Sequence, residues 1–170
     1  MTTLTTARLT LRKFSPHDLD RLAELMSDPG FMKFSGGDVF TREQAAASLE
    51  RILAAERAGK PSQFAVIFRE TSTLIGYCGF FVQNVDDKDE VEIGYRLDPA
   101  HWGRGLASEA AQAVRDHAFR DLKLPHVISL IHPDNAASIR VAEKNGMTLR
   151  RETTWRGFPT LIYQVGAAPR

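Results

Sequence analysis

The central part of the chain has the pattern of a strand, a glycine-bearing loop, a helix and a second strand. VEIGYRL at 91–97 predicts the first strand, and the loop at 101–105 leads into a helix expected over 106–120, with alanines at helical spacing. HVISLI at 126–131 is too short for a helix and predicts a strand. Two strands joined through a helix must pair in parallel. This β-α-β crossover restricts the fold more than any other feature.

The flanking sequence predicts antiparallel strands and further helices. Short apolar runs separated by turn residues indicate strands, and capped stretches with apolar residues at helical spacing indicate helices. We expect additional strands at 7–13, 63–69, 74–83, 147–156 and 160–165, and helices at 15–26, 45–58 and 135–145. Asp28-Pro29-Gly30 is expected to stop the first helix, Gly36-Gly37 to form a loop, and residues 84–90 to form a turn. The predicted fold class is α+β, with about seven strands and about four helices.

Composition places the chain among ordinary globular proteins. Its 170 residues include 43% hydrophobic and 25% charged residues, which excludes collagen-like, disordered and disulfide-stapled classes and predicts one domain over 1–170. The net charge of +1 gives no overall signal for nucleic acid or a membrane surface. However, residues 1–100 carry net −3 and residues 101–170 carry net +4, so the second half suits a polyanion better.

Localisation and redox context follow from simple absences in the sequence. No run approaches the roughly 18 apolar residues of a membrane span, and the first residues alternate polar and apolar, unlike a signal peptide. Cys78 is the only cysteine, so an intramolecular disulfide is excluded. We expect a cytoplasmic protein that binds neither nucleic acid nor membrane.

The loop before the central helix has the chemistry of an anion site. Gly103 and Gly105 allow tight turning and close approach of a ligand, and the helix start presents unpaired N–H groups with partial positive charge. A P-loop is excluded because no Lys-Ser/Thr pair follows, and a dinucleotide fingerprint does not fit this topology. Two glycines before a helix are also compatible with a plain loop.

Comparison with a known family gives a more specific interpretation of this loop. Trp102 to Ala107 resembles the acyl-CoA diphosphate loop of GNAT acetyltransferases, Gln/Arg-x-x-Gly-x-Gly/Ala, with Trp102 at the first position. The run from EIGY through Asp-Pro to Trp-Gly-x-Gly is similar to the branch that contains the ribosomal-protein N-terminal acetyltransferases. Asn135 to Ser138, Glu143 to Met147 and the opening TARLTLRKFSPHD also fit that branch, so the resemblance covers nearly the whole chain.

The resemblance implies a mostly antiparallel sheet whose parallel pair splays apart to hold acetyl-CoA. The pantetheine arm would bond to backbone groups near Gly94 to Leu97, and the diphosphate would lie on the glycine loop. The residues expected at the cofactor are Tyr95, Arg96, Leu97, Trp102, Gly103, Arg104, Gly105, Leu106, Ala107, Ser108 and Asn135. No metal is expected, because the histidines lack the spacing of zinc ligands.

Two side chains are candidates for catalysis. Glu92 on the central strand is the expected general base, directly or through water, and Ser138 is expected to donate a hydrogen bond to the departing thiolate. Backbone N–H groups at 95–97 would meet the oxyanion. Three other interpretations stay open: an arginine-paired or solvent-facing Glu92, a solvent-facing Ser138, and a solvated Arg104.

The predicted activity is transfer of an acetyl group to a primary amine in a ternary complex, with the α-amine of a protein or peptide as acceptor. One alternative keeps the chemistry but takes a polyamine, amino acid or antibiotic, and the acidic residues at 86–90 would attract such a cation. Another is a non-catalytic acyl-CoA-binding module. Expected exposed sheet edges near 156–165 leave monomer and homodimer open.

Overall fold

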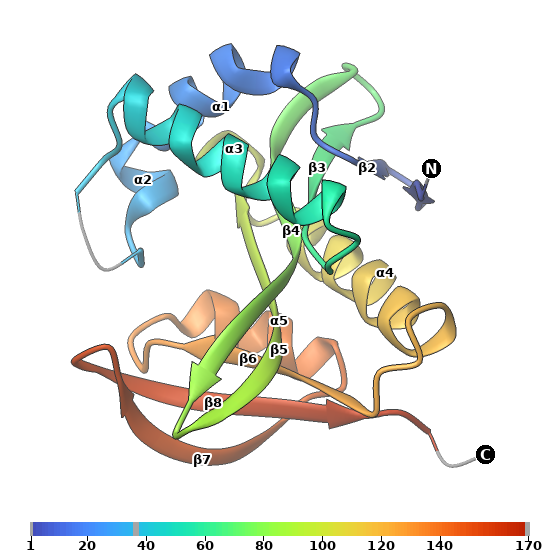
Figure 1. The fold of residues 1–170 in the computed structure, drawn as a ribbon, viewed down its shortest axis with the longest axis vertical. Coiled ribbons are helices and arrows are strands. Elements are labelled where there is room, and N and C mark those ends of the chain that lie inside the picture. Colours follow the sequence, from blue (N-terminus) through green and yellow to red (C-terminus); the bar gives the residue numbers. More distant parts are fainter. Residues whose placement is uncertain (1, 36–37, 169–170) are drawn as a thin grey trace.

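A computed structural model describes residues 2–35 and 38–168 (Figure 1). One sheet runs through the described residues in the order β1-β2-β3-β4-β5-β6-β8-β7, with β5 and β6 as its parallel pair. The strands are β1 (Leu4–Thr5), β2 (Leu9–Arg12), β3 (Gln63–Phe68), β4 (Thr73–Val85), β5 (Lys88–Leu97), β6 (His126–Ile131), β7 (Thr148–Trp155) and β8 (Phe158–Gly166). The helices are α1 (Leu19–Met26), α2 (Pro29–Met32), α3 (Arg42–Arg57), α4 (Leu106–Arg120) and α5 (Ala136–Lys144). The α+β class and the central crossover are confirmed.

The helices cover the two faces of the sheet separately. On one face, α4 buries an alanine-rich side that includes Ala110, Ala111 and Val114 against β4, β5 and β6, and α5 packs beside it. On the other face, α1, α2 and α3 pack over β3 and β4, with Leu22 and Met32 fully buried (Figure 1). Small side chains let α4 approach the sheet closely, so the start of this helix is fixed relative to the ends of β5 and β6.

Two local expectations are wrong and one is incomplete. The first helix stops before Asp28 as expected, since α1 ends at Met26, but the Asp28 carboxylate also accepts a hydrogen bond from the Phe31 amide (2.9 Å) and caps the short helix α2. Residues 84–90 are not a long turn, since β4 and β5 continue to a tight turn at Asp86 and Asp87, both with positive φ. Residues 158–166 are not a sheet edge, because β8 lies between β6 and β7, and the edge strands are β1 and β7.

Two further expectations concern counts and coverage. The described residues form eight strands rather than about seven, since β1 pairs with β2 through Leu4 and Leu11, and five helices rather than about four, since α2 is added. The expected Gly36-Gly37 loop lies outside the described residues. In the described parts of the chain, no helix combines the length and apolar character needed to cross a bilayer.

A buried carboxylate fixes the chain between β2 and α1. Asp18 accepts hydrogen bonds from the Arg12 guanidinium (2.7 and 2.9 Å) and from the amide and hydroxyl of Ser15. Burial alone would raise the pKa of Asp18, but these donors outweigh it and hold the pKa below its ordinary value. The ionised form is therefore favoured by folding.

We expect Asp18→Asn to lower the free energy of unfolding by about 1–3 kcal/mol at neutral pH, because the charge-assisted hydrogen bonds are lost. A depressed pKa contributes stability above the ordinary carboxyl pKa, and this contribution is lost as the pH falls through the folded-state value. Urea unfolding at neutral pH and at pH about 3 measures the difference. A gap between wild type and variant that does not shrink at the lower pH would contradict this account.

Candidate active site

Strands β5 and β6 separate almost as soon as they meet. Their ladder consists of a single registered pair, Glu92 with Ile128, within the described residues. Directly after this pair, the Ser129 hydroxyl donates a 2.7 Å hydrogen bond to the Ile93 carbonyl and spans the widening gap. The β6-facing backbone of Gly94 to Leu97 is left without a strand partner, and unpaired backbone groups in such a position favour an extended ligand.

The glycine loop lies beside the open end of this gap. Gly103 and Gly105 adopt left-handed conformations, with φ of 72° and 75°. A Cβ built on Gly103 would meet nothing within 4 Å, so the loop needs glycine for its backbone conformation rather than for space. The first amides of α4, on Leu106, Ala107 and Ser108, have no partner inside the helix and lie at its positive end.

The turn between β1 and β2 holds the loop in place. Arg8 donates from Nη1 to the Arg104 carbonyl (2.8 Å), and its amide and Nε bind the Glu109 carboxylate (both 2.8 Å). Thr6 donates to the same carboxylate. Burial would raise the pKa of Glu109, but these hydrogen bonds lower it. Sequence reasoning missed this support, since nothing local links residues a hundred positions apart.

Two loop side chains have definite positions. The Trp102 indole donates to the Leu97 carbonyl (2.8 Å), which joins the end of β5 to the loop, while 53% of the side chain stays exposed. Arg104 is exposed, and its guanidinium lies 4.7 Å from the centre of the Phe68 ring. The stacking orders Arg104 at the edge of the loop instead of leaving it fully solvated.

Glu92 projects from β5 at the point where the strands diverge. Gln83 donates to one carboxylate oxygen (2.9 Å) and the Leu130 amide donates to the other (3.4 Å). Burial raises the pKa of Glu92, although these donors and the charges of Arg96 and Arg156 oppose the shift. The structure shows Glu92 partly buried, and no arginine ion pair of Glu92 is found in the described residues, so neither of its other interpretations fits.

Ser138 lies in the first turn of α5, across the gap from β5. Its amide donates to the Asn135 side chain (3.1 Å), and its carbonyl accepts from the Tyr95 hydroxyl (3.0 Å). Burial raises the pKa of Tyr95, so this phenol stays protonated and remains a donor. The backbone of Ser138 is thus fixed from both sides, and the structure shows its side chain partly buried rather than facing solvent.

Most of the acidic residues near the β4–β5 turn already have partners. Asp86 pairs with Arg151, Asp89 accepts from Asn84, and Glu90 contacts His126 at 2.6 Å. Only Asp86 is paired with an arginine, so the described residues of this turn keep negative charge on Asp87 and Asp89. The described residues contain no group of three His, Cys, Asp or Glu side chains placed to hold a metal ion.

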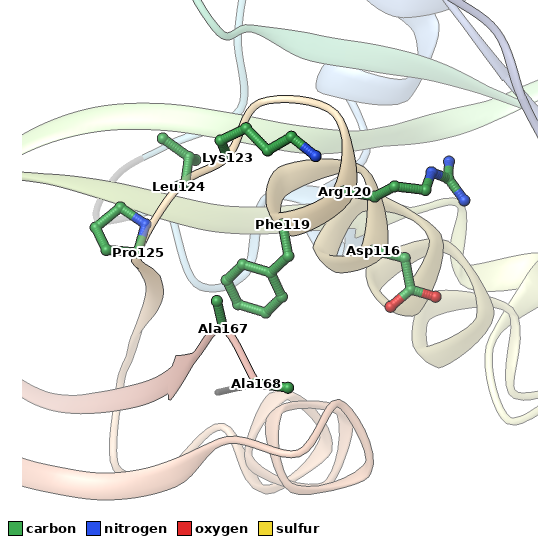
Figure 2. Close-up of a pocket in the computed structure, with 8 residues that line it drawn as sticks. All are labelled: Asp116, Phe119, Arg120, Lys123, Leu124, Pro125, Ala167 and Ala168. Atoms are coloured by element: carbon green, nitrogen blue, oxygen red, sulfur yellow. The ribbon is translucent and has the colours of Figure 1, made fainter. Parts of the chain in front are cut away.

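One pocket of the described residues lies far from the glycine loop, while a smaller one of about 390 Å³, lined by residues that include Arg8, Phe68 and Arg104, lies beside it. Figure 2 shows a pocket of about 550 Å³ at the C-terminal end of α4, lined by Phe119, Arg120, Lys123, Pro125 and Ala167 among others. The 15 residues of α4 separate it from the glycine loop by roughly 20 Å. Pocket size therefore does not locate the site, whose main feature is a gap between strands.

A parallel pair that splays beside a glycine loop at the start of the connecting helix defines the acyl-CoA N-acyltransferase architecture. Residues 8–148 match the family model described as an acetyltransferase (GNAT) domain, and the chain belongs to this family. The predicted family is confirmed.

Relatives agree over nearly the full length. The chain is 37% identical over 161 residues to the uncharacterized N-acetyltransferase p20 of Bacillus licheniformis, covering 93% of this chain and 88% of p20. A crystal structure of a GNAT-family acetyltransferase from Bacillus anthracis superposes with a TM-score of 0.83 at 28% identity, covering 97% and 98% of the two chains. The ribosomal-protein-serine acetyltransferase of Escherichia coli is 35% identical over 85 residues, covering 49% of this chain and 46% of that protein. The chain is an acyltransferase.

Proposed function

We propose that residues 1–170 form one domain that transfers an acetyl group from acetyl-CoA to the α-amine of a protein or peptide, by direct attack in a ternary complex. The observation that carries the proposal is the position of Glu92. Glu92 forms the one registered pair of β5 and β6 that the described part of the chain contains, where the gap begins. A base at that point meets an amine that approaches from the sheet face opposite α4.

The residues around the gap fit acetyl-CoA. The β6-facing backbone of Gly94 to Leu97 offers N–H and C=O groups to the amides of pantetheine, in particular those of Tyr95, whereas the backbone groups of Arg96 face β4. The loop from Trp102 to Ser108 offers left-handed glycines and open amides to the diphosphate, and Asn135 lies at the start of α5 near the thiol end. The proposal needs no metal.

The chemistry divides among few groups. Glu92, in its ionised form, takes a proton from the ammonium of the acceptor, directly or through water, and the neutral amine then attacks the thioester carbonyl. Backbone N–H groups of β5 at 95–97 stabilise the oxyanion formed at the thioester carbonyl. Ser138 donates a hydrogen bond to the thiolate as it leaves, and the products are the N-acetylated acceptor and free coenzyme A. Asn135 and Tyr95 position Ser138.

The protein or peptide acceptor rests on two arguments. An α-amine has a pKa near ~7.7–8.0, against ~10.4 for a lysine side chain, so far more of it is unprotonated at neutral pH. The relative from Escherichia coli is named for acetylation of a ribosomal protein. We place the reaction in the cytoplasm, where acetyl-CoA is available, with the enzyme as a monomer or homodimer.

A panel of acceptors tests the proposal. Purified protein is mixed with acetyl-CoA and peptides, polyamines, amino acids or aminoglycosides, and both free thiol and the mass of the acceptor are followed. We expect peptides with free α-amines to gain one acetyl group. If a small amine is acetylated faster than the peptides, the proposed acceptor is wrong and the small amine takes its place. Tight binding of coenzyme A with no acetyl transfer would favour a non-catalytic acyl-CoA-binding module.

We expect Ser138→Ala to lower kcat by about 10- to 100-fold, because one hydrogen bond to a charged leaving group is lost. The affinity for coenzyme A should change little, since the backbone contacts of Ser138 remain. Steady-state kinetics and calorimetry separate the two effects. Equal kcat for wild type and variant would remove Ser138 from the mechanism, and Ser138→Cys, which keeps a donor, is expected to recover part of the rate.

A further inference from the structure

Arg96 is a partly buried cation on the acceptor face of the sheet without a carboxylate partner. It registers directly opposite Tyr77, whose side chain packs among α1, α2 and α3, so Arg96 lies on that same face. Its one hydrogen bond in the described residues runs from Nη1 to the Met32 sulfur at 3.6 Å. A thioether is a weak acceptor, whereas a guanidinium carries five donors.

Two other partly buried arginines form ion pairs with carboxylates. Arg12 pairs with Asp18 at 2.7 Å, and Arg21 pairs with Asp98 at 2.6 Å and Glu24 at 2.8 Å. Arg96 has no such pair in the described residues, and a partly buried charge without one is costly. The donors of Arg96 therefore remain available to a ligand.

The groups next to Arg96 do not neutralise it. The Tyr77 hydroxyl lies beside the guanidinium, but burial raises the pKa of Tyr77, and the phenol stays uncharged. Glu92 projects from the same face of β5, four residues away, which corresponds to about 13 Å between the two backbone positions, and the two charges act on each other without forming an ion pair in the described residues. Its two oxygens are held by Gln83 and the Leu130 amide, not by Arg96.

We propose that Arg96 binds an anionic group of the acceptor while Glu92 receives its amine. This inference rests on the proposed function and gives the acceptor a chemical class: an amine that carries a carboxylate at a distance matching the spacing of Glu92 and Arg96. In an extended peptide, successive residues advance by about 3.3 Å, so an acidic side chain two to four residues after the α-amine spans the distance from Glu92 to Arg96. An amino acid supplies the same two groups when its chain is long enough to span this separation.

Matched acceptors test the inference. One series uses peptides with Asp or Glu at the second, third or fourth position, each beside its Asn or Gln counterpart. The other series uses amino acids of increasing chain length beside their carboxamides. We expect kcat/KM to favour the acid by about 10- to 100-fold in one series, because a charged hydrogen bond distinguishes the pair. The series that shows the preference identifies the source of the carboxylate.

Variants assign the preference to Arg96. In Arg96→Gln the ratio of acid to amide should fall towards one, and Arg96→Lys should keep part of it. Lys33→Gln is the matched control, because it removes a neighbouring exposed positive charge that lies 5.4 Å from the Phe34 ring and does not contact Arg96. The ratio compares two acceptors on one protein, so a general loss of stability or cofactor affinity cancels.

The outcomes separate this inference from the proposed function. Equal turnover of acids and amides, a preference for polyamines, or an unchanged ratio in Arg96→Gln would overturn the role of Arg96 and leave acetyl transfer intact. If no amine is acetylated, the proposed function fails. In that case, calorimetry of the acid and amide in the presence of coenzyme A decides on Arg96: tighter binding of the acid, lost in Arg96→Gln, supports the inference, and equal binding contradicts it.

Discussion

Glu92→Gln is expected to lower kcat by about 10²- to 10⁴-fold at neutral pH, the range for loss of a general base. Glutamine keeps the shape of the side chain, and its single oxygen can still accept from one of the two donors, Gln83 or the Leu130 amide, which lie 2.9 and 3.4 Å from the two oxygens of Glu92. What it loses is the ability to take a proton. Steady-state kinetics with the best acceptor measures the effect.

The pH dependence adds a signature. A base works only when ionised, and burial raises the pKa of Glu92, so the wild-type rate should fall with decreasing pH earlier than it would for an exposed glutamate. The variant should lack this decrease in rate at low pH. The ionisation of the acceptor amine affects wild type and variant equally. A pH profile of the same shape in wild type and variant would show that another group is the base.

Stability provides the control for this variant. Because the folded-state pKa of Glu92 is raised, ionisation of Glu92 lowers stability as the pH rises from the ordinary carboxyl value through the raised one. Glutamine does not ionise, so the variant should unfold at the same temperature as wild type or higher at neutral pH. Its affinity for coenzyme A should also be kept, which separates lost chemistry from lost structure.

Gly105→Val is expected to weaken binding of coenzyme A by at least about 100-fold, equivalent to two charge-assisted hydrogen bonds. Gly105 has φ of 75° at the start of α4, a conformation that costs a residue with a Cβ roughly 1–2 kcal/mol. The loop should relax by moving its amides away from the diphosphate. Calorimetry with coenzyme A measures the loss.

Gly59→Val is the matched control. Gly59 has φ of 67° at the end of α3, and a Cβ built there meets nothing within 4 Å. The backbone cost is therefore similar, but the position does not belong to the glycine loop. Both variants should lose comparable stability in urea, and only Gly105→Val should lose the cofactor. Unchanged affinity in Gly105→Val would mean that the diphosphate does not bind at this loop.

The local patterns in the sequence were sufficient for most of the elements and their order. The apolar run at 126–131 and the helix over 106–120 are both observed, because burial on a sheet face and on one helix face imposes distinct spacings. The short elements β1 and α2 were missed; at Asp28 the predicted helix stop is observed, but the same carboxylate also caps the next helix. The left-handed glycines of the loop were also indicated in advance, since few other residues adopt that conformation.

The candidate site residues could be predicted from the sequence, but the contacts around them could not. Glu92, Ser138 and the glycine loop were predicted as site residues from the sequence because they lie in continuous motifs. Three other features could be identified only from the tertiary structure. They are the hydrogen bond of Arg8 to the loop, the hydrogen bond of the Ser129 hydroxyl to β5, and the absence of a carboxylate partner for Arg96 in the described residues. Each depends on side chains from distant segments that meet only after the sheet assembles, and local periodicity carries no information about such contacts. The sequence alone determines which catalytic and binding side chains the protein has. The packing of the sheet decides which of these side chains are paired with each other and which can bind a ligand.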